Sequence, residues 1–224
     1  MMINCKPIYS SQQTIHSNLV GSIRRYQETT FTKPVSAHTA QAFEELNLVL
    51  ENNKMPLILD SGCGTGDSTK RLAATWPDCF VIGIDKSEVR LARAQSGKDS
   101  GSNFTFVRAD LFDFWRLAVQ SGLKVDRHFV FYPNPWPKST QLKRRIHGHP
   151  AFAQFVQLGT EFEVRSNWKI YVDEFACAFK LWTGIGAAVQ EIVPVEPYWT
   201  AFERKYVLSK HPIYQFKIVV EPHD

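Results

Sequence analysis

The stretch PLILDSGCGTG, residues 56–66, decides the fold of this chain. Its apolar run at 57–59 ends in Asp60 and has the composition of a buried strand. Three glycines follow at alternate positions, Gly62, Gly64 and Gly66. Glycine tolerates positive φ and lets a ligand approach the backbone closely, and free N–H groups at the start of the helix expected next attract polar or anionic groups. We therefore predict a strand, a tight turn and a helix that together hold a nucleotide-like cofactor.

The composition is that of an ordinary globular protein. The chain has 224 residues, of which 44% are hydrophobic and 21% charged, and a net charge of +4, which suits one α/β domain with a large core. Its four cysteines have no metal or redox spacing, so we expect reduced, mostly buried thiols in a cytoplasmic protein without a bound metal. The N-terminus has no apolar signal core, and no apolar run reaches about 18 residues. We therefore expect neither secretion nor a membrane span.

Strand-like and helix-like segments alternate after residue 50. Continuous apolar strands are typical of a parallel sheet that helices cover on both faces. We therefore predict an α/β fold with a doubly wound, mostly parallel seven-stranded, Rossmann-like sheet in residues 51–224, preceded by an N-terminal arm and helix at 1–50. Strands are expected at 57–60, 80–85, 104–108, 125–132, 168–172, 187–193 and 214–220. Helices are expected at 37–50, 68–76, 87–95, 111–121, 151–162 and 175–183.

Acidic residues occupy the ends of the first three predicted strands: Asp60, Asp85 and Asp110. The carboxyl ends of parallel strands lie at one edge of a sheet, where α/β proteins bind ligands. Asp85 is placed to accept hydrogen bonds from ribose hydroxyls, and Asp110 from the exocyclic amine of adenine. Each aspartate alone has a simpler interpretation as the cap of the next helix. The tight G-x-G-x-G spacing after Asp60 favours S-adenosylmethionine (SAM), so we predict a class I SAM-dependent methyltransferase whose cofactor site contains the three aspartates and the three glycines.

A stiff polar loop follows the fourth predicted strand. It reads YPNPWPK at residues 132–138, and its prolines fix φ and remove backbone donors. The amide of Asn134, the indole of Trp136 and the ammonium of Lys138 would stand beside the reactive end of the cofactor. A flipped-out base needs such an aromatic plane and such polar partners. The simpler alternative is a proline-rich turn with Trp136 in the core.

A basic run lies shortly after this loop. It consists of Lys143, Arg144 and Arg145, and His147 and His149 come next. Cations just outside a base-sized pocket are natural contacts for nucleic-acid phosphates. The same run in isolation is equally typical of a solvated surface. Together with the loop, it predicts an RNA substrate.

These motifs, in this order, resemble those of the bacterial tRNA (guanine-N7)-methyltransferase family. That family carries an aspartate-glycine turn, a Pro-Asp-Pro-Trp-Pro-Lys loop, a Lys-Arg-Arg run, a Thr-Asp pair after strand five and a Thr-Lys-Phe-Glu stretch near the C-terminus. The counterparts here are DSGCGTG at 60–66, PNPWPK at 133–138, KRR at 143–145, VD at 172–173 and TAFE at 200–203. The similarity therefore spans most of the predicted domain.

The resemblance implies an enzyme that transfers the methyl group of SAM to N7 of a guanine in tRNA. Asn134 would be the catalytic loop residue and would line the cofactor site beside the aspartates. The positions assigned to the tRNA are Lys138, Lys143, Arg144, Arg145, Asp173, Thr200, Phe202 and Glu203. Because guanine N7 carries a lone pair in the ring plane, the task of such an enzyme is positioning, without a strong general base.

The chain departs from the family pattern at three positions. Asn134 replaces the loop aspartate, Val172 a hydroxyl residue and Ala201 a lysine. An aspartate can accept from both N1–H and N2–H₂ of guanine and offset the charge that methylation creates, whereas an amide has one acceptor group and no charge. Loss of such a charge-assisted contact costs on the order of 2–3 kcal/mol, equivalent to roughly 30- to 150-fold in rate.

Three alternatives therefore remain open from the sequence. The loop faintly resembles the Asn-Pro-Pro-aromatic loop of enzymes that methylate exocyclic amines, which indicates a different base as the acceptor. A non-catalytic paralogue that binds SAM or RNA is the second alternative. A nicotinamide oxidoreductase is the third, although no acid–base pair for hydride transfer can be identified.

Overall fold

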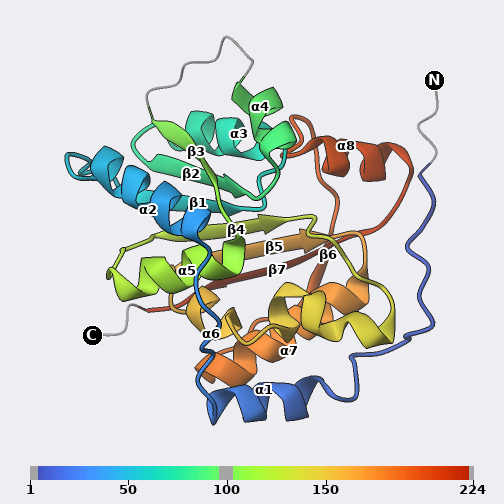
Figure 1. The fold of residues 1–224 in the computed structure, drawn as a ribbon. Coiled ribbons are helices and arrows are strands. Elements are labelled where there is room, and N and C mark those ends of the chain that lie inside the picture. Colours follow the sequence, from blue (N-terminus) through green and yellow to red (C-terminus); the bar gives the residue numbers. More distant parts are fainter. Residues whose placement is uncertain (1–4, 96–102, 222–224) are drawn as a thin grey trace.

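The computed structural model describes residues 5–95 and 103–221. Within these residues, seven strands form one sheet in the order β3-β2-β1-β4-β5-β7-β6 (Figure 1). β7 runs antiparallel to both neighbours, and the other pairs are parallel. The strands are β1 (Leu57–Ser61), β2 (Phe80–Asp85), β3 (Phe104–Arg108), β4 (Arg127–Phe131), β5 (Glu161–Ser166), β6 (Gln190–Ile192) and β7 (Ile213–Val219). The predicted doubly wound, mostly parallel seven-stranded sheet is confirmed.

Helices cover both faces of the sheet (Figure 1). α3 and α4 pack on one face, α2, α5, α6 and α7 lie on the other, and α1 packs on the outside of α7. The helices are α1 (Leu19–Gln27), α2 (Ala37–Leu50), α3 (Asp67–Thr75), α4 (Glu88–Gln95), α5 (Leu111–Gln120), α6 (Phe152–Phe155), α7 (Lys169–Thr183) and α8 (Ala201–Leu208), with the 3₁₀-helices η1 (Ser139–Arg144) and η2 (Ile146–Gly148).

The sheet divides the apolar interior into two cores. Successive side chains of a strand point to opposite faces, and β1 shows this clearly, since Leu57 and Leu59 join the larger core and Ile58 the smaller one. The larger core is rich in aromatic rings. The ring of Phe155, which is fully buried, lies within 5.4 Å, centroid to centroid, of five others: Trp115, His128, Phe152, Phe162 and Phe175.

The sequence predictions fail around β5. The helix expected at 151–162 is reduced to α6, because residues 161–166 pair with β4 and β7. Charged residues interrupt the apolar pattern of this strand, so the sequence does not indicate it. They have partners on neighbouring strands, as in the ion pair between Arg127 and Glu161 at 3.0 Å. The prediction of a strand at 168–172 is wrong as well. Trp168 is the N-cap of α7 and the next four residues form its first turn, and the buried side chains of α7 recur at helical spacing. Two further helices, α1 and α8, have no counterpart among the predicted elements.

An extended strap, residues 5–16, runs along the side of the molecule on which β4 and β5 end, before α1 begins (Figure 1). At its start, the carbonyl of Cys5 is 2.9 Å from Nε2 of His211. Further along, the hydroxyl of Ser10 donates to the carbonyl of Pro137 at 2.6 Å. The strap therefore lies directly against the proline-rich loop.

The described residues contain four cysteines, all of them free. Cys63 and Cys79 are buried, and Cys5 and Cys177 are half-buried. No helix within the described ranges combines the length and the apolar character needed to cross a bilayer. In the same ranges, no three His, Cys, Asp or Glu side chains converge as a metal site would require.

Replacement of Phe155 by alanine tests the aromatic core. We expect Phe155→Ala to lower the free energy of unfolding by about 3–5 kcal/mol, because it removes a large buried side chain and leaves a cavity. Urea denaturation followed by circular dichroism measures this change. Val193→Ala, at a side chain that is 87% exposed, is the control and should change stability by less than about 0.5 kcal/mol. Equal midpoints for the two variants would contradict this description of the core.

Candidate active site

The site is positioned by the adjacency of β1 and β4. These strands are hydrogen-bonded neighbours although β2 and β3 separate them in the sequence. Ligands of doubly wound proteins bind at such a reversal of strand order, outside the carboxyl ends of the strands. Asp60 is level with Phe129 of β4, so the glycine turn after β1 and the loop after β4 leave the sheet side by side.

The glycine turn leaves space for a ligand. Gly62, Gly64 and Gly66 have φ values of 87°, 57° and 80°, which other residues adopt only with strain. A Cβ added to Gly64 would meet nothing within 4 Å, and one added to Gly62 would meet only Leu111, at 4.0 Å. A Cβ on Gly66 would lie 2.5 Å from the ring of Phe106. The first two glycines therefore border open space, while the third is required for packing.

Asp60 holds the turn against the following helix. It is buried, and its Oδ2 accepts hydrogen bonds from the hydroxyls of Ser68 and Thr69, both at 2.6 Å. Burial raises the pKa of Asp60 to about 6, and these hydrogen bonds oppose the rise only in part. Asp60 therefore fixes the start of α3 relative to β1.

Asp85 faces the glycine turn, as predicted. Its Oδ2 accepts from the backbone N–H of Gly64 at 3.0 Å, and its Oδ1 accepts from the N–H of Ser87 at 2.8 Å. Asp110 caps α5, since its Oδ1 accepts from the N–H of Phe112 at 3.0 Å. Each carboxylate oxygen has two lone pairs, so the capping role of these residues is compatible with a further contact to a ligand. The turn and the aspartates therefore fit the ribose and adenine of SAM.

An aromatic wall stands beside Asp110, and it was not predicted from the sequence. The rings of Phe112 and His149 stack with centroids 3.7 Å apart, and Phe31 packs edge-on against His149 at 5.1 Å. Burial lowers the pKa of His149 to about 4, although Asp110 opposes this shift. His149 is therefore a neutral stacking partner and not part of a basic run. The wall unites three segments that lie far apart in the sequence.

The loop at 132–138 has a strained backbone. Tyr132 and Trp136 have φ values of 53° and 45°, and such left-handed conformations cost on the order of 1–3 kcal/mol each for bulky residues. They persist only where the surroundings enforce them. The amide of Asn134 is exposed and bonds to no other residue in the part of the chain that the structure describes. It is therefore available to a substrate.

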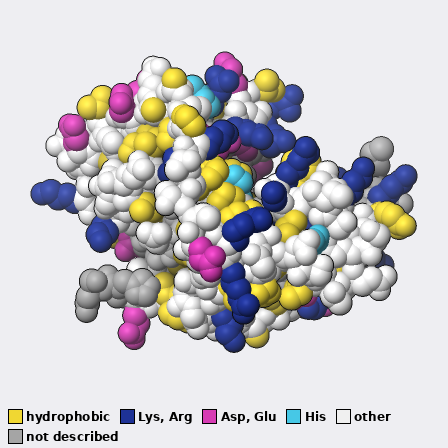
Figure 2. All heavy atoms as spheres, turned by 60° about the horizontal axis from the view of Figure 1, so that its bottom comes forward, with side chains coloured by type: hydrophobic (Ala, Val, Ile, Leu, Met, Phe, Trp, Pro, Cys, Tyr) yellow, Lys and Arg dark blue, Asp and Glu magenta, His cyan; other side chains and the backbone are white. Residues whose placement is uncertain are grey.

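The basic run divides into an exposed and a buried part. Lys138, Lys143 and Arg144 are exposed, and the guanidinium of Arg144 lies 4.9 Å from the ring centroid of Trp136. The prediction that Arg145 contacts phosphates is wrong, because its side chain is fully buried and forms an ion pair with Glu174. His147 is buried beside it, and its Nε2 donates to the same carboxylate at 2.8 Å. Seen from the side of α1, Lys and Arg side chains gather across the middle of the molecular surface (Figure 2).

The substrate role predicted for Glu203 is also corrected. Glu203 is 1% exposed, and its carboxylate is occupied by the hydroxyl of Tyr132 at 2.8 Å, the guanidinium of Arg165 at 2.8 Å and the N–H of Trp199 at 2.8 Å. It therefore holds the residues before α8 against the end of β4 and is not free to bind a base. In the same segment, Thr200 caps α8, with its hydroxyl accepting from the N–H of Glu203 at 2.9 Å, and Phe202 is exposed.

Asp173 does not follow strand five, contrary to the prediction. It lies within α7, where its carboxylate pairs with Lys169 at 2.8 Å, and the adjacent Val172 is fully buried core. The pair at the end of β5 is Ser166-Asn167. By position, Asn167 and not Asp173 is the counterpart of the family aspartate. The chain therefore carries amides at both strand ends, Asn134 after β4 and Asn167 after β5.

The sequence contains one signal that points to the buried ion pair. α7 reads KIYVDEFACAFKLWT, and Glu174 falls on its buried face together with Tyr171, Phe175 and Ala178. An acidic residue at a core position requires a buried partner. The partner itself, Arg145, can be identified only in the folded chain.

Most of the chain matches a known family of proteins. A family model described as "Putative methyltransferase" matches residues 54–216. The chain belongs to this methyltransferase family. The chain is 29% identical to the tRNA (guanine-N(7)-)-methyltransferase of Saccharophagus degradans, over 67% of this chain and 69% of the relative. It is 28% identical to the enzyme of that name from Stutzerimonas stutzeri, over 72% of this chain and 71% of the relative. The resemblance derived from the motifs is confirmed.

Solved structures support the same fold. An antibiotic-related methyltransferase superposes with a TM-score of 0.57 at 17% identity, over 85% of this chain and 97% of the other. A 16S rRNA (adenine(1408)-N(1))-methyltransferase from Catenulisporales acidiphilia, solved with SAM, gives a TM-score of 0.54 at 14% identity, over 81% and 92%. This methyltransferase therefore has the class I SAM-dependent fold that the glycine turn predicted.

Asp85 provides the most direct test of the cofactor site. We expect Asp85→Asn to weaken SAM binding by at least about tenfold, because an amide has only one oxygen to share between backbone N–H groups and ribose hydroxyls. Isothermal titration calorimetry with SAM measures the effect. Asp78→Asn, in the exposed connection between α3 and β2, should leave the affinity unchanged. An unaltered Kd for Asp85→Asn would remove Asp85 from the cofactor site.

Proposed function

We propose that this methyltransferase transfers the methyl group of SAM to N7 of a guanine in tRNA. One observation carries the proposal: an open glycine turn and a loop with an exposed amide lie at the carboxyl ends of the neighbouring strands β1 and β4. A donor and an acceptor bound there would be adjacent. The names of the curated relatives support guanine N7 as the acceptor atom and tRNA as the substrate.

One set of residues binds SAM and another binds the guanine. Gly62 and Gly64 leave room for SAM, while Asp85 and Asp110 hold its ribose and adenine. When bound, SAM supplies a methyl group on a positively charged sulfur. The carbonyl oxygen of Asn134 accepts a hydrogen bond from the N1–H or N2–H₂ edge of the guanine. Because N7 already offers a lone pair, the site needs orientation and exclusion of water rather than a base.

The exposed cations grip the RNA backbone in this proposal. Lys138, the last residue of the loop, and Lys143 and Arg144, in the 3₁₀-helix that follows it, are exposed. Each phosphate contact releases counterions, so RNA affinity should fall steeply with salt. The stacking of Arg144 on Trp136 gives this cation a fixed position relative to the loop.

A second acceptor is favoured by one specific observation. Asn134 and Asn167 place two amides, and no carboxylate, directly after β4 and β5. An amide oxygen is a suitable acceptor for an exocyclic amine, and it carries no charge to stabilise an N7-methylated base. Methylation of an exocyclic amine is therefore the second candidate.

Methyl transfer to unmodified tRNA tests the proposal. Purified protein, SAM with a labelled methyl group and tRNA made by transcription should yield 7-methylguanosine on nucleoside mass analysis. The enzyme from Saccharophagus degradans, assayed in parallel, is the positive control. Label in an amine-methylated nucleoside would select the second candidate. No transfer beside an active control would refute both.

Restoring the loop carboxylate tests the role of Asn134. We expect Asn134→Asp to raise the rate of N7 methylation roughly 30- to 150-fold, because a carboxylate offsets the charge that develops on the base. Single-turnover assays with saturating SAM measure the rate. Gln120→Glu, an equal charge change at the exposed end of α5, is the matched control. A rate that stays the same or falls in Asn134→Asp would indicate that the amide serves another acceptor.

A further inference from the structure

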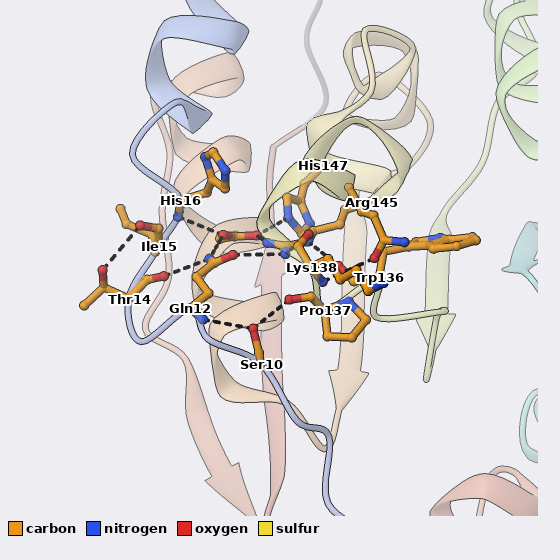
Figure 3. Close-up of polar contacts among 12 residues, drawn as sticks. Ser10, Gln12, Thr14, Ile15, His16, Trp136, Pro137, Lys138, Arg145 and His147 are labelled. Atoms are coloured by element: carbon orange, nitrogen blue, oxygen red, sulfur yellow. Dashed lines mark hydrogen bonds and ion pairs between the residues drawn. The ribbon is translucent and has the colours of Figure 1, made fainter.

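We propose that the N-terminal strap, residues 5–16, and Arg145 form a clamp that holds the loop at 132–138 in its working conformation. In this proposal Ser10, Gln12 and Arg145 are positioning residues, which act on the substrate through the loop. The role of the loop in catalysis rests on the proposed function. The clamp itself rests only on contacts within the chain (Figure 3).

The clamp binds three consecutive carbonyl groups of the loop. Nε of Arg145 donates to the carbonyl of Trp136 at 3.2 Å, and Nη2 donates to that of Lys138 at 3.4 Å. The carbonyl between them, that of Pro137, accepts from the hydroxyl of Ser10 at 2.6 Å. Residues far apart in the sequence therefore fix the same short piece of backbone.

Glu174 joins the strap to Arg145. Its carboxylate accepts from Nη1 of Arg145, from Nε2 of Gln12 and from the backbone N–H of His16, the last at 2.8 Å. Burial acts to raise the pKa of Glu174, but hydrogen bonds from His147 and Arg145 outweigh it and hold the pKa at about 2. Glu174 therefore stays ionised and keeps these donors in place.

Gln12 fits between the two charges because an amide has both a donor and an acceptor. Its Oε1 accepts from Nη2 of Arg145 at 3.0 Å, while its Nε2 donates to Glu174. A glutamate at this position would set a second carboxylate against Glu174. The contact is therefore specific for an amide, although the strap has no regular secondary structure.

The loop depends on such a clamp because its own backbone has few amide donors that could hold it against the rest of the protein. Prolines at 133, 135 and 137 remove amide donors, and Trp136 is held at a φ of 45°. A residue in this conformation persists only when its surroundings over-determine it. Trp136 lies two residues after Asn134, so a change at Trp136 moves the amide that is proposed to meet the base.

Limited proteolysis tests the clamp without any assumption about activity. Trypsin can cut after the exposed Lys138 only when the loop opens locally, and the cleavage rate then follows the population of the open form. We expect Gln12→Glu to accelerate this cut at least about tenfold and Ser10→Ala about threefold, because each loses a partly buried hydrogen bond. Gln13→Glu, the exposed neighbour with the same charge change, should cleave at the wild-type rate. Mass spectrometry of the fragments identifies the cut.

Methyl transfer to tRNA then tests positioning. We expect Gln12→Glu and Ser10→Ala to lower kcat for tRNA by about the same factors as they accelerate cleavage, with the Kd for SAM unchanged. Ser10→Thr, which keeps the hydroxyl, should restore both readouts. Arg145→Lys, which keeps the charge but not the planar fork, should behave like Gln12→Glu.

Two results would overturn the proposal. One is cleavage of Gln12→Glu at the wild-type rate, which would show that the strap does not hold the loop. The other is faster cleavage with unchanged kcat and KM, which would show that loop order does not matter for transfer. If the wild-type protein methylates no tRNA, the proposed function fails, and the proteolysis result alone decides whether the clamp exists.

Discussion

The adjacency of β1 and β4 is the constraint on which the rest of the structure depends. The chain completes β1, builds β2 and β3 outward on one side, and then returns to add β4 on the other side of β1. A right-handed crossover of parallel strands permits this arrangement only with helices on both faces. The result is that a glycine turn and a proline-rich loop, about 70 residues apart in the sequence, leave the sheet next to each other. The donor and acceptor sites follow from that neighbourhood.

Two ion-pair networks, one fully buried and one largely buried, stabilise the acceptor side of this crevice. Arg145 with Glu174 fixes the backbone of the loop, and Arg165 with Glu203 fixes the residues before α8 against Tyr132. Buried ion pairs add little net stability compared with apolar packing, because desolvation of the charges is costly. These ion pairs instead fix the positions of the segments around them, since each guanidinium or carboxylate forms hydrogen bonds with several segments in a defined geometry. Arg145 and Glu203, two charged residues of the motifs assigned to the substrate, thus hold the backbone in place from inside the protein. The exposed cations beside them are the ones that are accessible to a substrate.

The strands of the first half of the sheet were predicted closely from the sequence, but the fifth strand was predicted at the wrong residues. The helix at 37–50 and the strands at 80–85 and 104–108 have the predicted bounds. No charged side chain interrupts the two strands before their last residues, Asp85 and Arg108. In β5, Glu161, Glu163 and Arg165 interrupt the pattern, and only their partners on β4, β7 and α8 make them compatible with a buried strand. The predicted fifth strand therefore ended at Val172, whereas β5 ends at Ser166. This error assigned a substrate role to Asp173 in place of Asn167.

By itself, the sequence determined the strand, glycine turn and helix, the three aspartates at strand ends and the stiff loop with Asn134. Each of these is a local property, set by φ preferences, by side-chain periodicity and by residues that end a strand. Only the tertiary structure decided which charges face the solvent. Arg144 and Arg145 are neighbours in the chain, yet one stacks on Trp136 at the surface and the other is buried against Glu174. The reason is physical: the fate of a charged side chain depends on whether a partner is within reach, and for Arg145 that partner comes from a helix 29 residues away and from the N-terminal strap.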